Sequence, residues 1–135
     1  MSAESHIQTV KTFYAAFVQG DVPGLLATLG DDIDWASETT STVAPWYGIR
    51  HGKDAVASYL QQLAETLEVK DFTPVRYAVA DSDVLTVVHF HATNRATGRQ
   101  VTMDLHHQFT FHDSHIVYFR GTEDTAQVEA TFQPA

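Results

Sequence analysis

The 135-residue sequence contains no cysteine, which excludes disulfide bonds, thiolate metal ligands and cysteine nucleophiles. It also lacks any apolar run near the roughly 18 residues that cross a membrane. The N-terminal "MSAESHIQTVK" has neither the basic start nor the apolar segment of a secretory signal. We therefore expect a cytoplasmic protein with no membrane partner, whose chemistry comes from histidine, carboxylate, tyrosine, hydroxyl or arginine side chains.

Basic residues are few: the sequence has 8 Lys and Arg but 17 Asp and Glu, which gives a formal net charge of −9. Binding to a phosphate backbone needs a basic surface that displaces counterions, so we expect no nucleic-acid partner. The sequence also lacks a phosphate-binding loop, HExxH, GxSxG and the dinucleotide glycine pattern. These absences leave no motif for a cofactor, and we predict none.

What the sequence does contain is one domain over residues 1–135, with helical spacing in its first half. Apolar residues three and four apart predict helices over residues 5–19 and 53–68. Asp21, Pro23 and Gly30 delimit a shorter predicted helix between them. The segment "DIDWAS" is typical of a short strand, and a loop with "APWYGIRHG" follows it.

After residue 70 the apolar spacing falls from about 3.6 to 2, which is typical of strands. Four extended segments, separated by "DSD", "RATG" and "HDS", are predicted over residues 72–80, 84–94, 100–112 and 115–122. Short links between consecutive strands favour an antiparallel meander, one face of which the helices cover. The predicted fold class is therefore α+β.

The stretch "MDLHHQFTFH" places His107 in an apolar row. Successive strand side chains point to opposite faces, so His107 shares its face with Met103, Leu105, Phe109 and Phe111. Such a histidine fills the core or borders a cavity where its protonation matters. Alternation alone leaves both interpretations open.

Three stretches carry a resemblance to a known family: "VKTFYAAFVQGDVPGLLATLGDDIDW", "PWYGIRHGKDAV" and "HHQFTFHDSHIVYFRGTEDTA". In this order they resemble the NTF2-like superfamily, and within it the SnoaL-like polyketide cyclases and the ketosteroid isomerase-like group. The resemblance implies a cone-shaped α+β barrel, in which a strongly curved antiparallel sheet wraps around three N-terminal helices. It also implies a cavity for a small apolar molecule and a homodimer formed through the outer face of the sheet.

Isomerases and cyclases of this group move a proton from a carbon beside a carbonyl, which requires a base and a donor to the enolate oxygen. The resemblance makes Tyr14 and His107 the candidate donors, or His107 a base. Its isomerase aspartate would fall near Ser37, where only the neighbouring Glu38 is acidic. Its cyclase carboxylates suggest Asp124 or Asp104 on the last strands, although by parity Asp104 faces away from His107.

Aromatic residues are candidates for the wall of such a cavity, because they close a pocket over a flat ligand. We predict that a ligand contacts Trp35, Trp46, Tyr59, Phe17, Met103 and Phe109. His89 and His91 join them if the hairpin pairs residue 91 with residue 103, and a shift of one residue sends both outside. With His107 they form an alternative metal-binding set, but His-x-His on a strand is a weak signal and we predict no metal.

These patterns lead to one functional hypothesis and one alternative. The first is a lyase, isomerase or cyclase that performs acid–base proton transfer on an apolar cyclic carbonyl compound, polyketide-like or steroid-like, with His107, Tyr14 and either Asp124 or Glu38 as its catalytic residues. The alternative is a ligand-binding or dimerisation module of the same fold without catalysis. Fold alone does not decide between them.

Overall fold

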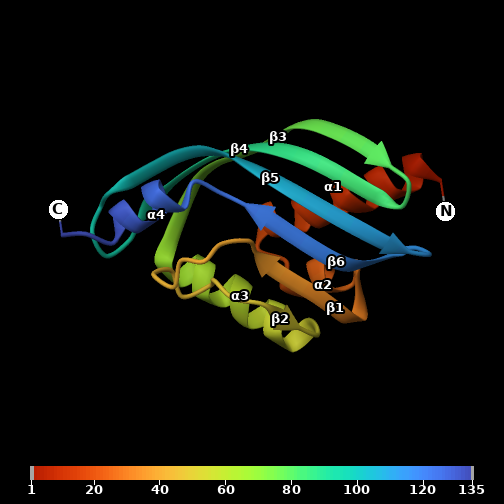
Figure 1. Cartoon of the computed structure of the whole chain (residues 1–135), viewed down its shortest axis with the longest axis horizontal. Coiled ribbons are helices and arrows are strands. Elements are labelled where there is room, and N and C mark those ends of the chain that lie inside the picture. Colours follow the sequence, from red (N-terminus) through yellow and green to blue (C-terminus); the bar gives the residue numbers. More distant parts are fainter. Residues whose placement is uncertain (1, 135) are drawn as a thin grey trace.

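The computed structural model describes residues 2–134, in which four helices and six strands form one α+β unit (Figure 1). The helices are α1 (Ala3–Gln19), α2 (Val22–Leu26), α3 (Lys53–Thr66) and α4 (Thr125–Thr131). The strands are β1 (Leu29–Ser37), β2 (Arg50–His51), β3 (Leu67–Ala80), β4 (Asp83–Asn94), β5 (Gln100–His112) and β6 (His115–Thr122). The α+β class and the order of the main elements are confirmed.

Local sequence signals explain where α1 begins and ends. The Ser2 side chain accepts a hydrogen bond from the Ser5 N–H at the N-terminus, and Gly20 ends the helix at φ 70°. Three of its apolar side chains, Val10, Phe13 and Tyr14, are buried against the sheet. The predicted helix and its buried face are therefore confirmed.

The second helix is shorter than predicted. Asp21 caps it by accepting from the Gly24 N–H, but α2 ends at Leu26. Gly30 is not a helix stop: it lies in β1, which begins at Leu29 and runs beside β6. In a sequence, a glycine can mark the end of a helix or a strand position with no room for a side chain. Gly30 is the second case, because a Cβ there would lie 3.2 Å from Val117 Cγ1.

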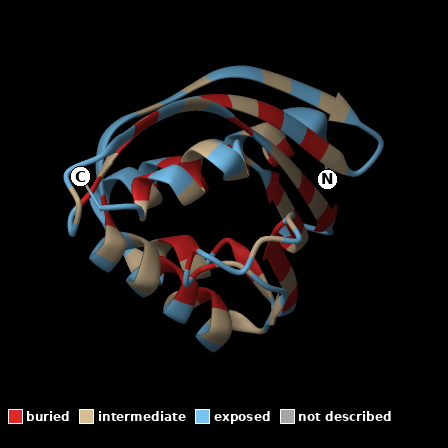
Figure 2. Cartoon of the chain, turned by 60° about the vertical axis from the view of Figure 1, so that its left-hand side comes forward, coloured by how far each residue is buried: buried red, intermediate tan, exposed pale blue. Residues whose placement is uncertain are grey.

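The six strands form a single curved sheet in the order β2-β1-β6-β5-β4-β3, which wraps over the helices without closing into a barrel (Figures 1 and 2). The predicted antiparallel meander of β3 to β6 is confirmed by the pairing of consecutive strands. Strand β1, however, pairs parallel to β6. The sheet is thus mixed, and its inner face is the one toward the helices.

The core lies between the inner face of the sheet and the helices, where alternate strand residues are buried (Figure 2). In β4, Val84, Val88 and Phe90 are buried, whereas Leu85 and His89 are exposed. This alternation determines which side chains reach the interior.

The C-terminal helix α4 was not predicted, and it holds the loop between β1 and β2 in place. Asp124 caps α4 by accepting from the Gln127 N–H. Ser41 in the loop donates to Glu129 Oε1 at 2.6 Å. The loop is thereby fixed against the open end of the sheet. None of the helices within residues 2–134 is both long and apolar enough to cross a membrane.

Candidate functional site

A row of polar and small residues crosses the inner face of the sheet through five strands. Strand pairing places Gly121 of β6 between Ser37 of β1 and His107 of β5. His107 pairs in turn with Thr86 of β4, which pairs with Tyr77 of β3. Paired residues share a face, so these residues form a polar band inside an otherwise apolar interior.

The centre of this band is a buried hydrogen-bond chain. The Tyr14 hydroxyl, from α1, lies 2.7 Å from His107 Nδ1 and 2.6 Å from Thr86 Oγ1. A phenol has one proton, so Tyr14 donates to one of these partners and accepts from the other. The chain therefore ties the imidazole tautomer to the orientation of the Tyr14 hydroxyl.

Burial determines the charge states in this chain. It lowers the pKa of His107 to about 3, with a smaller contribution from repulsion by His106. Burial likewise raises the pKa of Tyr14, an effect that the hydrogen bond with Thr86 partly offsets. At neutral pH both groups are uncharged, and the imidazole has one protonated and one free nitrogen.

A cavity of about 50 Å³ lies beside His107. Most of its lining is apolar: Phe13, Phe17, Trp35, Trp46, Leu60, Leu63, Leu67, Phe72, Phe90, Met103, Leu105, Phe119 and Gly121. Five polar side chains complete the lining: Ser37, Tyr59, His107, Thr122 and Glu123. A water molecule needs about 10–15 Å³ of such space, so the cavity has room for a few waters.

Glu123 is the carboxylate in this lining. It follows β6 directly, and its Oε2 accepts a hydrogen bond from the Tyr47 hydroxyl at 2.9 Å. Burial raises the pKa of Glu123, and hydrogen bonding from Tyr47 offsets part of the rise. A carboxyl group in this state takes up a proton more readily than an exposed one.

Four further polar groups belong to the same wall. Ser37 Oγ and the Tyr59 hydroxyl form a hydrogen bond of 3.0 Å. The indole N–H of Trp35 is buried and has no hydrogen-bond partner within residues 2–134. The indole of Trp46 lies close to Glu123, and its N–H lowers the pKa of that carboxyl group. An unpaired buried donor is costly, so Trp35 favours a guest that carries an acceptor.

Five of the predicted ligand contacts line the cavity: Phe17, Trp35, Trp46, Tyr59 and Met103. Phe109 lies behind the wall, fully buried, with its ring 5.9 Å from that of His107. Tyr14 is also absent from the lining among the described residues; it is buried, and its hydroxyl contacts His107 and Thr86.

The two carboxylates expected as bases lie outside the cavity. Glu38 is 62% exposed and forms an ion pair with Arg120 at 3.1 Å. Asp124 is exposed and caps α4. The lining carboxylate, Glu123, lies next to Asp124 in the sequence.

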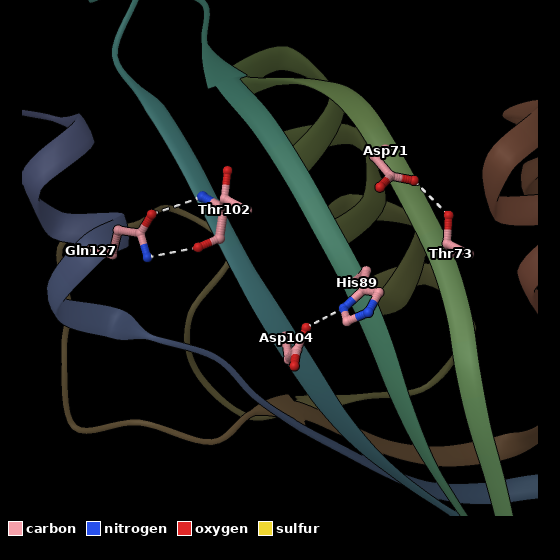
Figure 3. Close-up of polar contacts among 6 residues, drawn as sticks. All are labelled: Asp71, Thr73, His89, Thr102, Asp104 and Gln127. Atoms are coloured by element: carbon pink, nitrogen blue, oxygen red, sulfur yellow. Dashed lines mark hydrogen bonds and ion pairs between the residues drawn. The ribbon is translucent and has the colours of Figure 1, made fainter.

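His89 and His91 lie on the outer face of the sheet, because the hairpin pairs His91 with Thr102 instead of residue 103. Figure 3 shows His89 of β4 directed toward Asp104 of β5, with which it forms a hydrogen bond through Nδ1. His107 is on the opposite face, so these three histidines do not converge on a metal. Within residues 2–134 no three His, Asp or Glu side chains are grouped for metal binding.

Sequence reasoning missed Glu123, Thr86 and Gly121. Strand alternation could have identified Glu123. Phe119, Gly121 and Glu123 are two residues apart and so share a face, and Phe119 is buried in the core. Thr86 alternates with Val84 and Val88 in the same way. A threonine or glycine among apolar residues is otherwise unremarkable, and its role appears only with the cross-strand register.

Comparison with known proteins agrees with this architecture. The model of the SnoaL-like domain family matches residues 10–119. The chain therefore belongs to the SnoaL-like family, within the NTF2-like fold that the sequence resembles. No curated protein matches the chain.

Several solved structures share the fold over almost the whole chain. An NTF2-like protein of unknown function from Burkholderia pseudomallei is 25% identical, with a TM-score of 0.88 and coverage of 98% of this chain and 99% of that one. An NTF2-like protein from Burkholderia xenovorans is 28% identical, with a TM-score of 0.87 and the same coverage. A protein from Mesorhizobium loti, described as a candidate SnoaL-like polyketide cyclase, is 27% identical, with a TM-score of 0.69 and coverage of 85% and 96%.

Proposed function

We propose that the protein binds a small apolar cyclic carbonyl compound and transfers a proton at the carbon beside the carbonyl, as a lyase, isomerase or cyclase does. The observation that carries the proposal is a neutral imidazole on the wall of an aromatic cavity that also contains a half-buried carboxyl group. The similarity to a candidate SnoaL-like polyketide cyclase supports the same class of chemistry.

In this proposal Glu123 is the base. Its raised pKa suits a group that removes a weakly acidic proton near neutral pH. The Tyr47 hydroxyl donates to Oε2, and Trp46 contributes a second hydrogen bond to the same carboxyl group, so that its position in the wall is defined. Glu123 takes the proton from carbon, and the C–H electron pair moves into the enolate.

His107 stabilises the enolate oxygen as a neutral donor. For this role Thr86 donates to the Tyr14 oxygen and Tyr14 donates to Nδ1, so that Nε2 carries the proton. The ring edge with Nε2 lies next to Gly121, another residue of the cavity wall. A neutral imidazole is an effective donor to a developing enolate in an apolar site, where its hydrogen bond is strengthened.

Tyr14 and Thr86 act through His107 in this scheme. Their hydrogen bonds determine which imidazole nitrogen has the proton, and neither residue touches the substrate. Tyr14 is therefore a positioning residue instead of the direct donor expected from the resemblance. Protonated Glu123 then returns its proton to the enolate or to a neighbouring position, which completes the transfer.

The test is deuterium uptake from D₂O into a panel of cyclic ketones and lactones, followed by NMR. The wild-type protein is expected to accelerate uptake, and the Glu123→Gln and His107→Gln variants to lose most of that acceleration. Saturable binding with no acceleration would instead favour the alternative, a binding module without catalysis. Either outcome requires side chains of the cavity wall to move, because a cyclic guest needs more space than 50 Å³.

We also propose that two copies pair through the outer face of the sheet. Leu85 is 42% exposed there, between Ala78 and Gln108 on the neighbouring strands. A Leu85→Glu variant is expected to shift the mass measured by light scattering from dimer to monomer. Ile49→Glu, at a loop residue that is 66% exposed, is the matched control and leaves the mass unchanged. A monomeric wild-type protein would refute the pairing.

A further inference from the structure

A second hollow, the outer groove, adjoins the cavity beside His107. It has a volume of about 680 Å³ and lies between the end of α1, α2, α3 and the start of β3. Small-molecule sites usually span about 300–1,000 Å³, so the groove has the size that the cavity lacks. Its rim includes Val18 and Val69, which are 62% and 38% exposed.

The groove and the cavity share part of their walls. Five side chains line both hollows: Phe17, Leu60, Leu63, Leu67 and Phe72. The rings of Phe17 and Phe72 pack with their centroids 4.7 Å apart. Rotation of side chains at this shared wall would join the two hollows.

The unshared walls differ in chemistry. The cavity wall is aromatic and polar, with Trp35, Trp46, His107 and Glu123. The groove wall is aliphatic, with Val18, Val22, Leu25, Ala57, Ala64 and Val69. A ring with a carbonyl group matches the first surface, and a saturated chain matches the second.

The charges at the groove rim are already engaged. Lys70 pairs with Glu68 at 2.6 Å, and Asp71 accepts from the Thr73 hydroxyl at 2.5 Å (Figure 3). Arg95 donates through Nε to the Ala64 carbonyl. The two positive charges, Lys70 and Arg95, are balanced by the negative charges of Asp71 and Glu68, so the rim has no excess charge of one sign, which favours an uncharged chain.

We propose that the substrate has two parts: a cyclic ketone head, which enters the cavity beside His107, and an uncharged aliphatic tail, which lies in the outer groove. The proposal rests on the proposed function and specifies the substrate class of that site. The tail supplies binding through its apolar surface, and the head supplies the reacting carbon.

The test is a series of 4-alkylcyclohexanones from methyl to octyl, whose tails point away from the carbonyl. Binding is measured by quenching of the two tryptophans, and proton transfer by deuterium uptake at the carbons beside the carbonyl. Each added methylene is expected to tighten binding roughly fourfold until the groove is filled.

Two variants locate the tail. Ala64→Phe fills the groove from α3 and is expected to remove the gain from long tails while the methyl compound binds as before. Ala15→Phe, at an exposed alanine of α1 outside both hollows, is the matched control and keeps the full gain. Circular dichroism checks that both variants fold.

The outcomes separate this proposal from the proposed function. Equal affinity across the series, with deuterium uptake into the methyl compound, would refute the tail-binding proposal. The proposed proton transfer would still be supported. A chain-length gain that persists in Ala64→Phe would place the tail elsewhere and overturn the groove assignment. Absence of binding by every member would refute both proposals, and a chain-length gain without deuterium uptake would support the tail and refute catalysis.

Discussion

Gly121 and His107 face each other across β5 and β6, and the missing side chain of Gly121 leaves the space that the imidazole occupies. A Cβ at residue 121 would lie 3.1 Å from His107 Cδ2 and 3.4 Å from Nε2. Contacts this close require the ring to move. The glycine thus controls the position of the proposed donor.

A Gly121→Ala substitution is therefore expected to reduce deuterium uptake and to lower the free energy of unfolding by about 1–3 kcal/mol, as overpacking does. Gly30→Ala is the matched control, because its Cβ would meet Val117 Cγ1 at 3.2 Å, away from the cavity. It is expected to cost stability without loss of uptake. Equal uptake in the two variants would contradict the importance of space at Gly121.

The tautomer of His107 depends on Tyr14. Tyr14→Phe removes the hydroxyl that bonds to Nδ1, so the Nδ1–H form is expected to become populated and uptake to fall. The readout is the ¹⁵N chemical shift of the His107 ring. Tyr77→Phe, on the same polar row, is the control and is expected to leave the tautomer unchanged.

Thr86→Val tests the direction of the hydrogen-bond chain. If Tyr14 donates to Nδ1, as proposed, the variant keeps the Nε2–H form and loses about 1 kcal/mol of stability with one hydrogen bond. A switch from Nδ1–H in the wild type to Nε2–H in the variant would show that Tyr14 donates to Thr86 instead. That result would remove the donor role of His107 in the resting protein.

Glu123→Gln is expected to slow deuterium uptake by about 10²–10⁴-fold, the usual contribution of a positioned base. Uptake by the wild type is expected to fall as the pH drops through the pKa of Glu123, which burial raises above its ordinary value of 4.5. Asp124→Asn and Glu38→Gln are controls, since both carboxylates lie outside the cavity. Loss of uptake in Asp124→Asn alone would identify Asp124, instead of Glu123, as the base.

Burial of His107 also predicts a dependence of stability on pH. Between pH 6.5 and about 3 an unfolded histidine binds a proton, whereas folded His107 does not. Acidification through this window therefore lowers the free energy of unfolding, by up to about 1.4 kcal/mol per pH unit from this residue. In chemical denaturation, the free energy of unfolding should fall less on acidification for His107→Gln than for the wild type. For His112→Gln, at an exposed histidine, it should fall as much as for the wild type.

Strand alternation was sufficient to place His107 on the inner face, because β5 has apolar residues at only one parity near its centre. It was insufficient for β4, where Leu85 and Val87 alternate with Val84 and Val88, so that either face resembles the buried one. The register of the β4–β5 hairpin decides, and a turn such as "RATG" does not determine it from sequence. For this reason the facing of His89 and His91 stayed conditional.

The sequence pattern alone was not sufficient to identify the candidate base. Glu123 and Asp124 differ by one residue, and only the exact end of β6 and the start of α4 determine which one faces inward. Helix α4 is short and carries a weak apolar pattern, so neither boundary was predicted. The partner of Tyr14 was equally hidden, since Thr86 lies 72 residues away in sequence.

The proposed role of His107 is tested most directly by ¹⁵N NMR of its ring during addition of 4-methylcyclohexanone, with the signals assigned by comparison with His107→Gln. We predict a neutral ring with its proton on Nε2, no titration near pH 6.5, and a saturable shift of the Nε2 signal as the ketone binds. A ring that titrates near pH 6.5, or one whose signals stay unchanged while the ketone saturates the protein, would contradict this role.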